Sequence, residues 1–90
     1  MKTIAIIGSC DTKSREISFM REQIEAEGIK ALVIDVATGL KESKGFDVSR
    51  EEVAAAYGVN WMDMESKTKG EKIAFMMKAA ASYIEQIYYE

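Results

Sequence analysis

Two short apolar segments with one helical pattern between them constrain the fold of this chain most. The first segment, residues 2–7, is rich in isoleucine and nearly continuous in apolar character, as strands covered on both faces are. The second, residues 29–36, has the same character. The intervening residues 14–27 repeat apolar side chains about every 3.6 positions and stop at Gly28, a residue type that favours the left-handed conformation beyond a helix end. The sequence therefore predicts a βαβ unit with a right-handed crossover and two parallel strands.

Two further helices are predicted in the second half of the chain. Capping-box patterns at 49–52 and 68–71 predict the starts of a short helix over 50–57 and of a long helix over 69–88. The segment 59–67 between them is predicted to be irregular. The fold class is therefore α/β: a Rossmann-like βαβ unit with parallel strands, a short connecting helix and a long C-terminal helix.

The predicted sheet is too small for the helices around it. A two-stranded sheet is marginal alone, and the long helix carries a wide apolar face: Ile73, Met76, Met77, Ala80, Tyr83, Ile84 and Ile87. Leaving such side chains in water costs about 1.5–3 kcal/mol each. We therefore expect the sheet to be completed by self-association into a dimer or higher oligomer, through this helix or the sheet edge. Residues 1–90 are expected to form a single α/β domain or an N-terminal fragment of a larger Rossmann-like domain.

Composition narrows the functional classes. The formal net charge of −3 and the pI near 5.0 argue against a nucleic-acid partner, which usually needs a basic face. The chain has no His and one Cys, which excludes Ser-His-Asp and Cys-His catalysis and leaves no ligand set for a soft metal. No apolar stretch approaches the roughly 18 residues of a membrane span, and one Cys forms no internal disulfide. We expect a cytoplasmic protein without a membrane partner.

The loop after the first strand is the strongest candidate site. It combines a glycine for close approach, hydroxyl groups, a lysine and the N–H groups of a helix start, which suit a phosphate. Its candidate binding residues are Gly8, Ser9, Asp11, Thr12 and Lys13. The loop matches neither the Walker A pattern nor the Gly-x-Gly-x-x-Gly fingerprint. The alternative is a plain βα turn in which Asp11 or Thr12 caps the helix.

Other candidate residues are expected at the same edge of the sheet. Asp35, at the end of the second strand, occupies the place of the acid that binds ribose in dinucleotide folds; the alternative is that it orders the following loop. Thr68, Lys69 and Gly70 begin the long helix and are expected to line the same crevice, with a plain helix cap as the alternative. Cys10 lies near a helix N-terminus, but no base accompanies it, so we predict no catalytic residue.

The loop also carries a resemblance to a known family. Residues 8–13, Gly-Ser-Cys-Asp-Thr-Lys, are similar to the Gly-Thr-x-Asp-Thr-Lys opening of the Tm-one-like ATP-binding domain family, and residues 34–36, 47–54 and Gly70 resemble its later motifs. The resemblance implies a Rossmann-like N-terminal domain that binds ATP, with magnesium, and is usually oligomeric. Thr-Lys at 68–69 replaces the Asp-Arg of that family, so a point charge stands in place of a guanidinium fork. The resulting hypothesis is an ATP-binding module; the alternative is a self-associating structural module that binds no small molecule.

Overall fold

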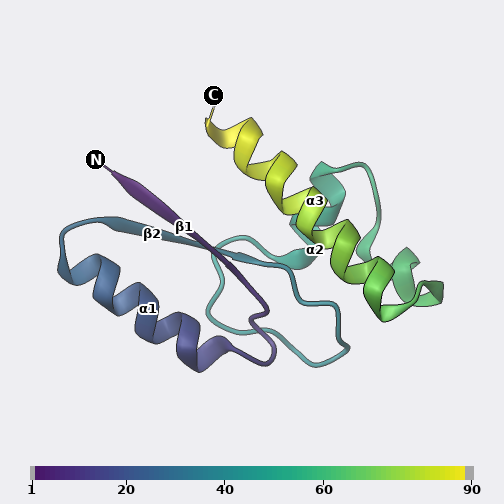
Figure 1. Cartoon of the computed structure of the whole chain (residues 1–90), viewed down its shortest axis with the longest axis horizontal. Coiled ribbons are helices and arrows are strands. Elements are labelled where there is room, and N and C mark those ends of the chain that lie inside the picture. The colour runs from purple at the N-terminus through teal and green to yellow at the C-terminus, as the bar shows by residue number, and fades with distance from the viewer. Residues whose placement is uncertain (1, 89–90) are drawn as a thin grey trace.

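The computed structural model describes residues 2–88 and has an α/β fold (Figure 1). Its elements follow in the order β1 (Thr3–Gly8), α1 (Ser14–Ala26), β2 (Lys30–Asp35), α2 (Arg50–Ala56), the 3₁₀ helix η1 (Trp61–Ser66) and α3 (Lys69–Tyr88). The two strands pair in parallel, in a register that runs from Thr3 opposite Lys30 to Gly8 opposite Asp35. The predicted βαβ unit, the α/β class and the long C-terminal helix are confirmed.

Helices cover both faces of β2. In Figure 1, α1 lies on one side of the strands, and α2 and α3 lie on the other. The side chains of β2 alternate accordingly: Ala31 and Val33 belong to a small core with Ile17 of α1, whereas Ile34 belongs to a larger core with Met76 of α3. This alternation is the period of two that a strand imposes. It explains why β2 is apolar along almost its whole length.

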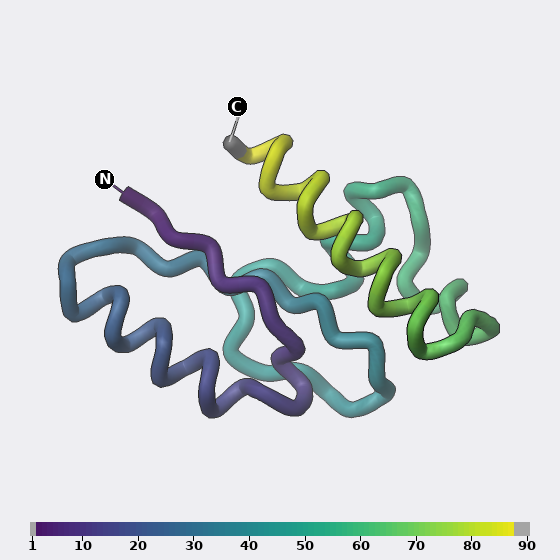
Figure 2. The backbone as a smooth tube through the Cα atoms, in the orientation of Figure 1, coloured from purple at the N-terminus to yellow at the C-terminus, as the bar shows by residue number. Residues whose placement is uncertain are grey.

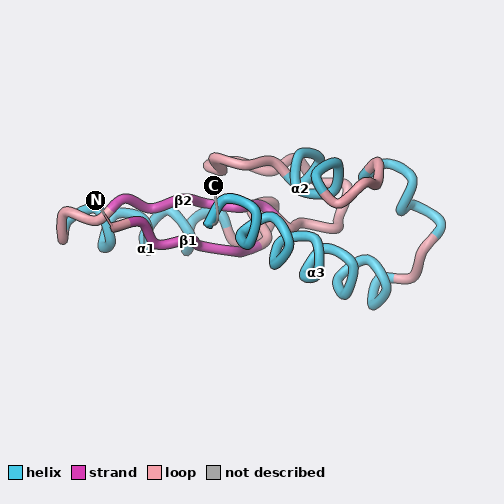
Figure 3. Tube along the Cα trace, turned by 90° about the horizontal axis from the view of Figure 1, so that it is seen from above, coloured by secondary structure: helices cyan, strands magenta, loops and turns pink. Residues whose placement is uncertain are grey.

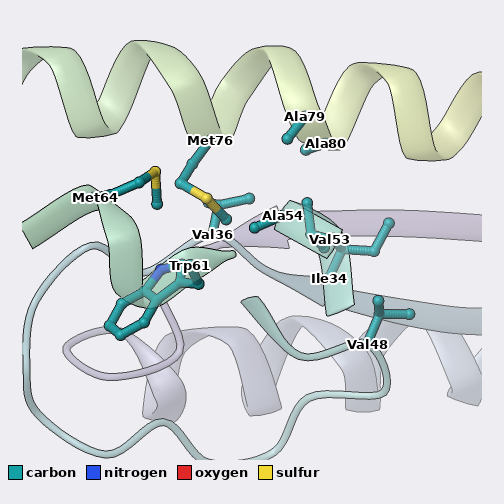
Figure 4. Packing of buried hydrophobic residues seen from close by; sticks show 10 residues of the cluster. All are labelled: Ile34, Val36, Val48, Val53, Ala54, Trp61, Met64, Met76, Ala79 and Ala80. Atoms are coloured by element: carbon teal, nitrogen blue, oxygen red, sulfur yellow. The ribbon is translucent and has the colours of Figure 1, made fainter. Parts of the chain in front are cut away.

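The larger core lies between β2, α2, η1 and α3 (Figure 4). Its buried members are Ile34, Val36, Val48, Val53, Ala54, Trp61, Met64, Met76, Ala79 and Ala80. Figure 4 shows Met76, Ala79 and Ala80 pointing from α3 toward the other core residues. The two alanines let α3 approach its neighbours closely, and Met76 fills the space that they leave.

Local sequence signals position the element ends. Gly28 and Gly58 follow α1 and α2 in the left-handed conformation, with φ of 77° and 84°. The predicted strands and the first two helices differ from the observed ones by one residue at their ends.

The expectation of an irregular segment at 59–67 is wrong, because η1 forms there. Its start is capped by Asn60, whose side chain accepts a hydrogen bond from the Met62 N–H at 3.0 Å.

β1 is less covered than β2. Among the described residues it pairs with β2 alone, so its other edge is free and the sheet is incomplete (Figure 3). Ile4 and Ile7 of this strand are 43% and 38% exposed. A groove of about 370 Å³ runs beside β1 and is lined by Thr3, Ala5, Leu32, Ile84 and Ile87. The helix α3 therefore packs over β2 and α2 and leaves one side of β1 open.

Two adjacent methionines test this packing of α3. Met76 is fully buried, whereas Met77 is 51% exposed. Replacing Met76 with Ala leaves a cavity in the larger core and is expected to lower the free energy of unfolding by about 2–5 kcal/mol. Met77→Ala is the matched control, for which we expect a change within about 0.5 kcal/mol. Urea unfolding followed by circular dichroism measures both, and equal effects of the two substitutions would contradict this placement of α3.

Candidate functional site

A cavity of about 380 Å³ lies where the two strands end. Its wall comes from three segments: the loop after β1, the segment after β2, and the first turns of α3. The lining residues are Ser9, Asp11, Thr12, Val36, Thr38, Gly39, Lys69, Ile73 and Met77. In Figure 2 the loop after β1 lies at the lower middle of the trace, with the segment after β2 and then the start of α3 to its right. Open α/β sheets bind their ligands at this place, beyond the carboxyl ends of the strands.

Four of the predicted site residues line the cavity. They are Ser9, Asp11, Thr12 and Lys69. Together they supply two hydroxyl groups, one carboxylate and one ammonium group. The part of the wall that α3 supplies continues as apolar side chains, because Ile73 and Met77 follow Lys69 on the same face of the helix. The cavity therefore offers a polar side and an apolar side to one ligand.

The other predicted site residues lie outside the cavity wall. They are Gly8, Lys13, Asp35, Thr68 and Gly70. At Gly8, an added Cβ atom would come within 2.8 Å of the Ile17 Cδ1 atom, so this glycine allows α1 to pack closely on β1. Lys13 is the exposed residue that precedes α1. A direct ligand contact by any of these five residues stays a prediction.

The start of α3 carries a complete capping box. The Glu71 carboxylate accepts a hydrogen bond from the Thr68 N–H at 3.0 Å, and the Thr68 hydroxyl accepts one from the Glu71 N–H at 3.2 Å. The first of these bonds is the largest cause that lowers the pKa of Glu71. The side chain of Thr68 is therefore engaged in holding the helix start that presents Lys69 to the cavity.

Asp35 joins the two loops that line the cavity. Its carboxylate is fully buried, and the Oδ1 atom accepts hydrogen bonds from the Cys10 N–H and the Ala37 N–H, each at 3.0 Å. Its Oδ2 atom has no hydrogen-bond partner among the described residues. Of the two roles considered for Asp35, ordering the following loop is the one that these contacts support.

The start of α1 has no side-chain cap. The alternative to a phosphate site, a turn in which Asp11 or Thr12 caps the helix, is wrong: Lys13 occupies the capping position and makes no side-chain hydrogen bond there. Within the described part of the chain, the N–H groups of Asp11 and Thr12 donate to no acceptor. The loop thus combines free donors with the positive end of a helix dipole, which favours an anion.

The sequence analysis did not predict that the segment after β2 lines the cavity. Thr38 and Gly39 line it from the segment after β2. Their N–H groups also have no acceptor in the described part of the chain. Their position soon after a parallel strand could have identified them, because the same kind of position identified the loop after β1 as a candidate site.

Cys10 is buried behind the cavity rather than in it. Burial, followed by the neighbouring Asp35 carboxylate, raises the pKa of its thiol to about 12. A protonated, enclosed thiol is a poor nucleophile at neutral pH.

Within residues 2–88, no cluster of three or more Cys, Asp and Glu side chains is placed to hold a metal ion. None of the helices in that range combines the length and the apolar character that a membrane span needs.

Comparison with known sequences assigns the family. The model of the uncharacterised protein family UPF0261, N-terminal domain, matches residues 2–90. The chain belongs to the UPF0261 family. It is 32% identical over 87 residues to a UPF0261 protein of Clostridium tetani (strain Massachusetts / E88), which covers 96% of this chain and 22% of the relative. A UPF0261 protein of Rhizobium meliloti (strain 1021) is 32% identical over 85 residues, with 93% and 21% covered. No solved structure matches the chain.

This family assignment corrects the resemblance drawn from the loop motifs. The match along residues 2–90 and the relatives named UPF0261 replace the Tm-one-like ATP-binding domain family, an identification that is wrong. The chain spans about a fifth of the length of the UPF0261 proteins from the two bacteria. Any function of this UPF0261 domain must therefore be argued from its own cavity and contacts.

The thiol of Cys10 gives a pH-dependent test of this site. Its pKa is raised from 9.0 to about 12 in the folded protein. Below pH 9 the thiol is protonated in both the folded and the unfolded protein. As the pH rises above 9, the thiol of the unfolded protein loses its proton first, so the free energy of unfolding falls progressively. At pH 8 the raised pKa lowers the thiolate fraction by about a thousandfold. We expect iodoacetamide to label the folded protein far more slowly than the protein in guanidinium chloride, and equal rates would contradict the buried, protonated thiol.

Proposed function

We propose that this UPF0261 domain binds a nucleotide, ATP with magnesium, in the cavity at the carboxyl ends of β1 and β2. The observation that carries the proposal is the convergence of anion-binding groups in one place. Asp11, Thr12 and Lys69 line this cavity, and the N–H groups of Asp11 and Thr12 have no acceptor among the described residues. The uncapped helix α1 begins two residues after Thr12. Helix starts and unpaired loop N–H groups are the donors that proteins use for phosphate.

The two sides of the cavity suit the two ends of a nucleotide. Ser9, Thr12 and Lys69 supply polar contacts for phosphate oxygens, while Ile73 and Met77 supply an apolar surface for a base. Asp11 adds a carboxylate, which repels a bare phosphate anion. A magnesium ion bound to the phosphates removes that repulsion, because Mg²⁺ takes carboxylate and phosphate oxygens together. This is why the magnesium complex is proposed rather than free ATP.

No reaction is assigned to the proposed site. The Cys10 thiol is buried with its pKa raised to about 12, and the chain has no histidine to act as a general base. The cavity residues bind and orient, and none of them is a recognisable nucleophile paired with a base. Binding rather than catalysis is therefore the function proposed.

Calorimetric titration with Mg-ATP tests the proposal. We expect the wild-type protein to bind, and Thr12→Ala and Lys69→Ala each to weaken binding about tenfold, because each removes one polar or charged contact with phosphate. Lys78→Ala, on an exposed part of α3, is the charge-matched control and is expected to bind as wild type. Lys13→Ala is expected to have a smaller effect than Lys69→Ala, since Lys13 lies outside the cavity wall. Wild-type affinity weaker than millimolar, or insensitivity to Thr12→Ala and Lys69→Ala, would refute a phosphate site here.

The free edge of β1 favours a second function, self-association. The strand Thr3–Gly8 contains no charged residue and no proline, the usual devices that protect an edge from pairing. Its exposed Ile4 and Ile7, and the apolar groove beside it, add surface that is unfavourable in water. We propose that a second copy pairs its own β1 with this edge about a two-fold axis, which joins the two small sheets into one.

Sedimentation equilibrium at micromolar concentration tests this assembly. We expect a dimer for the wild-type protein and a shift to monomer for Ile4→Glu, because a charge on the edge strand opposes pairing. Phe19→Glu is the control, because Phe19 is an exposed apolar residue of α1 rather than of β1. A folded wild-type monomer, or a dimer lost equally in both variants, would show that β1 is not the interface.

A further inference from the structure

Arg50 binds the loop that follows β2 and forms part of the cavity wall. It is the first residue of α2 and is 8% exposed. Its Nη1 group donates to the carbonyl oxygens of Gly39 and Lys41, at 3.0 and 3.3 Å. Both acceptors belong to the loop that follows β2, and Gly39 lines the cavity. One guanidinium group thus ties the start of a helix to this loop.

Trp61 contacts Arg50 and binds the same loop. The Arg50 Cζ atom lies 4.1 Å from the centroid of the Trp61 ring, a cation–π contact. The indole Nε1–H donates to the carbonyl oxygen of Ala37 at 3.2 Å. The two side chains therefore bind the carbonyl groups of Ala37, Gly39 and Lys41, which are alternate residues. We name this pair of residues, Arg50 and Trp61, the clamp.

The clamp determines the direction of the intervening N–H groups. No cis peptide bond occurs in the described chain, and in a trans peptide the N–H points opposite to the C=O of the same planar unit. Since the Ala37 carbonyl is directed at Trp61, the N–H of Thr38 points away from the clamp. The same reasoning applies to Gly39 and the N–H of Leu40. The clamp thus leaves donors on the side of the loop that faces away from it.

Stability alone does not explain an arginine at position 50. Burying a guanidinium group removes it from water. Among residues 2–88, the one carboxylate in contact with it is that of Glu51, at 3.4 Å between Nε and Oε2 on a half-exposed side chain. An apolar side chain of similar length would fill the same space beside Trp61 without this desolvation. What an apolar side chain lacks is the Nη1 group, which donates to two loop carbonyls.

We propose that Arg50 and Trp61 are positioning residues for the nucleotide cavity. They hold the loop 37–41 so that the N–H of Thr38 stays available to a phosphate group, and they do not line the cavity themselves. This inference rests on the proposed nucleotide binding, and it adds the residues that set the shape of that site. It predicts that affinity depends on side chains that make no ligand contact.

Three variants and one control test the clamp. Arg50→Met removes the donors. Arg50→Lys keeps the charge but not the planar guanidinium group that lies over Trp61, and Trp61→Phe keeps an aromatic ring but removes the indole donor. Lys78→Met removes one exposed positive charge and is the control. Mg-ATP affinity is measured by calorimetry, and thermal unfolding is measured alongside. In the free protein, hydrogen exchange is measured at the N–H groups of Ala37 and Lys44, which are hydrogen-bonded on either side of the loop.

We expect all three clamp variants to weaken Mg-ATP binding about tenfold and to speed hydrogen exchange at Ala37 and Lys44, while Lys78→Met matches the wild type. A loss in Arg50→Lys shows that geometry rather than charge is responsible. Should Arg50→Met fail to fold, Arg50→Lys and Trp61→Phe decide the matter.

Clamp variants that fold and bind as wild type overturn the inference. A wild-type protein that binds no Mg-ATP refutes the proposed function instead. In that case faster exchange in the clamp variants still supports the hold on the loop, and unchanged exchange overturns it.

Discussion

One buried carboxylate holds the two strand-end loops together. The Oδ1 atom of Asp35 accepts hydrogen bonds from the N–H groups of Cys10 and Ala37, one in each loop. Hydrogen bonds to a carboxylate are among the stronger ones in proteins, at about 1.5–3 kcal/mol each. Without Asp35, both N–H groups would be left without this acceptor, and the loops would lose their link at the point where the cavity begins. The geometry of the cavity therefore depends on a side chain that does not line it.

The same arrangement recurs on each wall of the cavity. Asp35 fixes the loop after β1, the clamp of Arg50 and Trp61 fixes the loop after β2, and the capping box of Thr68 and Glu71 fixes the start of α3. None of these five residues lines the cavity. Side chains held by such supporting contacts need less reorganisation when a ligand arrives, so more of the contact energy is left for binding.

Signals that act over a few residues were predictable from the sequence, and contacts across the chain were not. Gly28 and the capping box at 68–71 act locally, and the helix boundaries that they mark were predicted within one residue. The bond from Asp35 to the Cys10 N–H joins residues 25 apart, and the bond from Arg50 to Gly39 joins residues 11 apart. No periodicity encodes such pairs. The family was also misassigned from short motifs at residues 8–13, 34–36, 47–54 and Gly70, whereas the match along residues 2–90 decides it.

The cavity and the open side of β1 share one stripe of α3. Ile73 and Met77 line the cavity, and Ile84 and Ile87 line the groove beside β1, at the i, i+4, i+11 and i+14 spacing of a single helix face. A chain that pairs with β1 would therefore cover a surface continuous with the apolar wall of the cavity. If binding and pairing both occur, each alters the surface available to the other, and the coupling between them must be equal in both directions. The open side of the sheet and the ligand site are thus linked, because one face of α3 lines both.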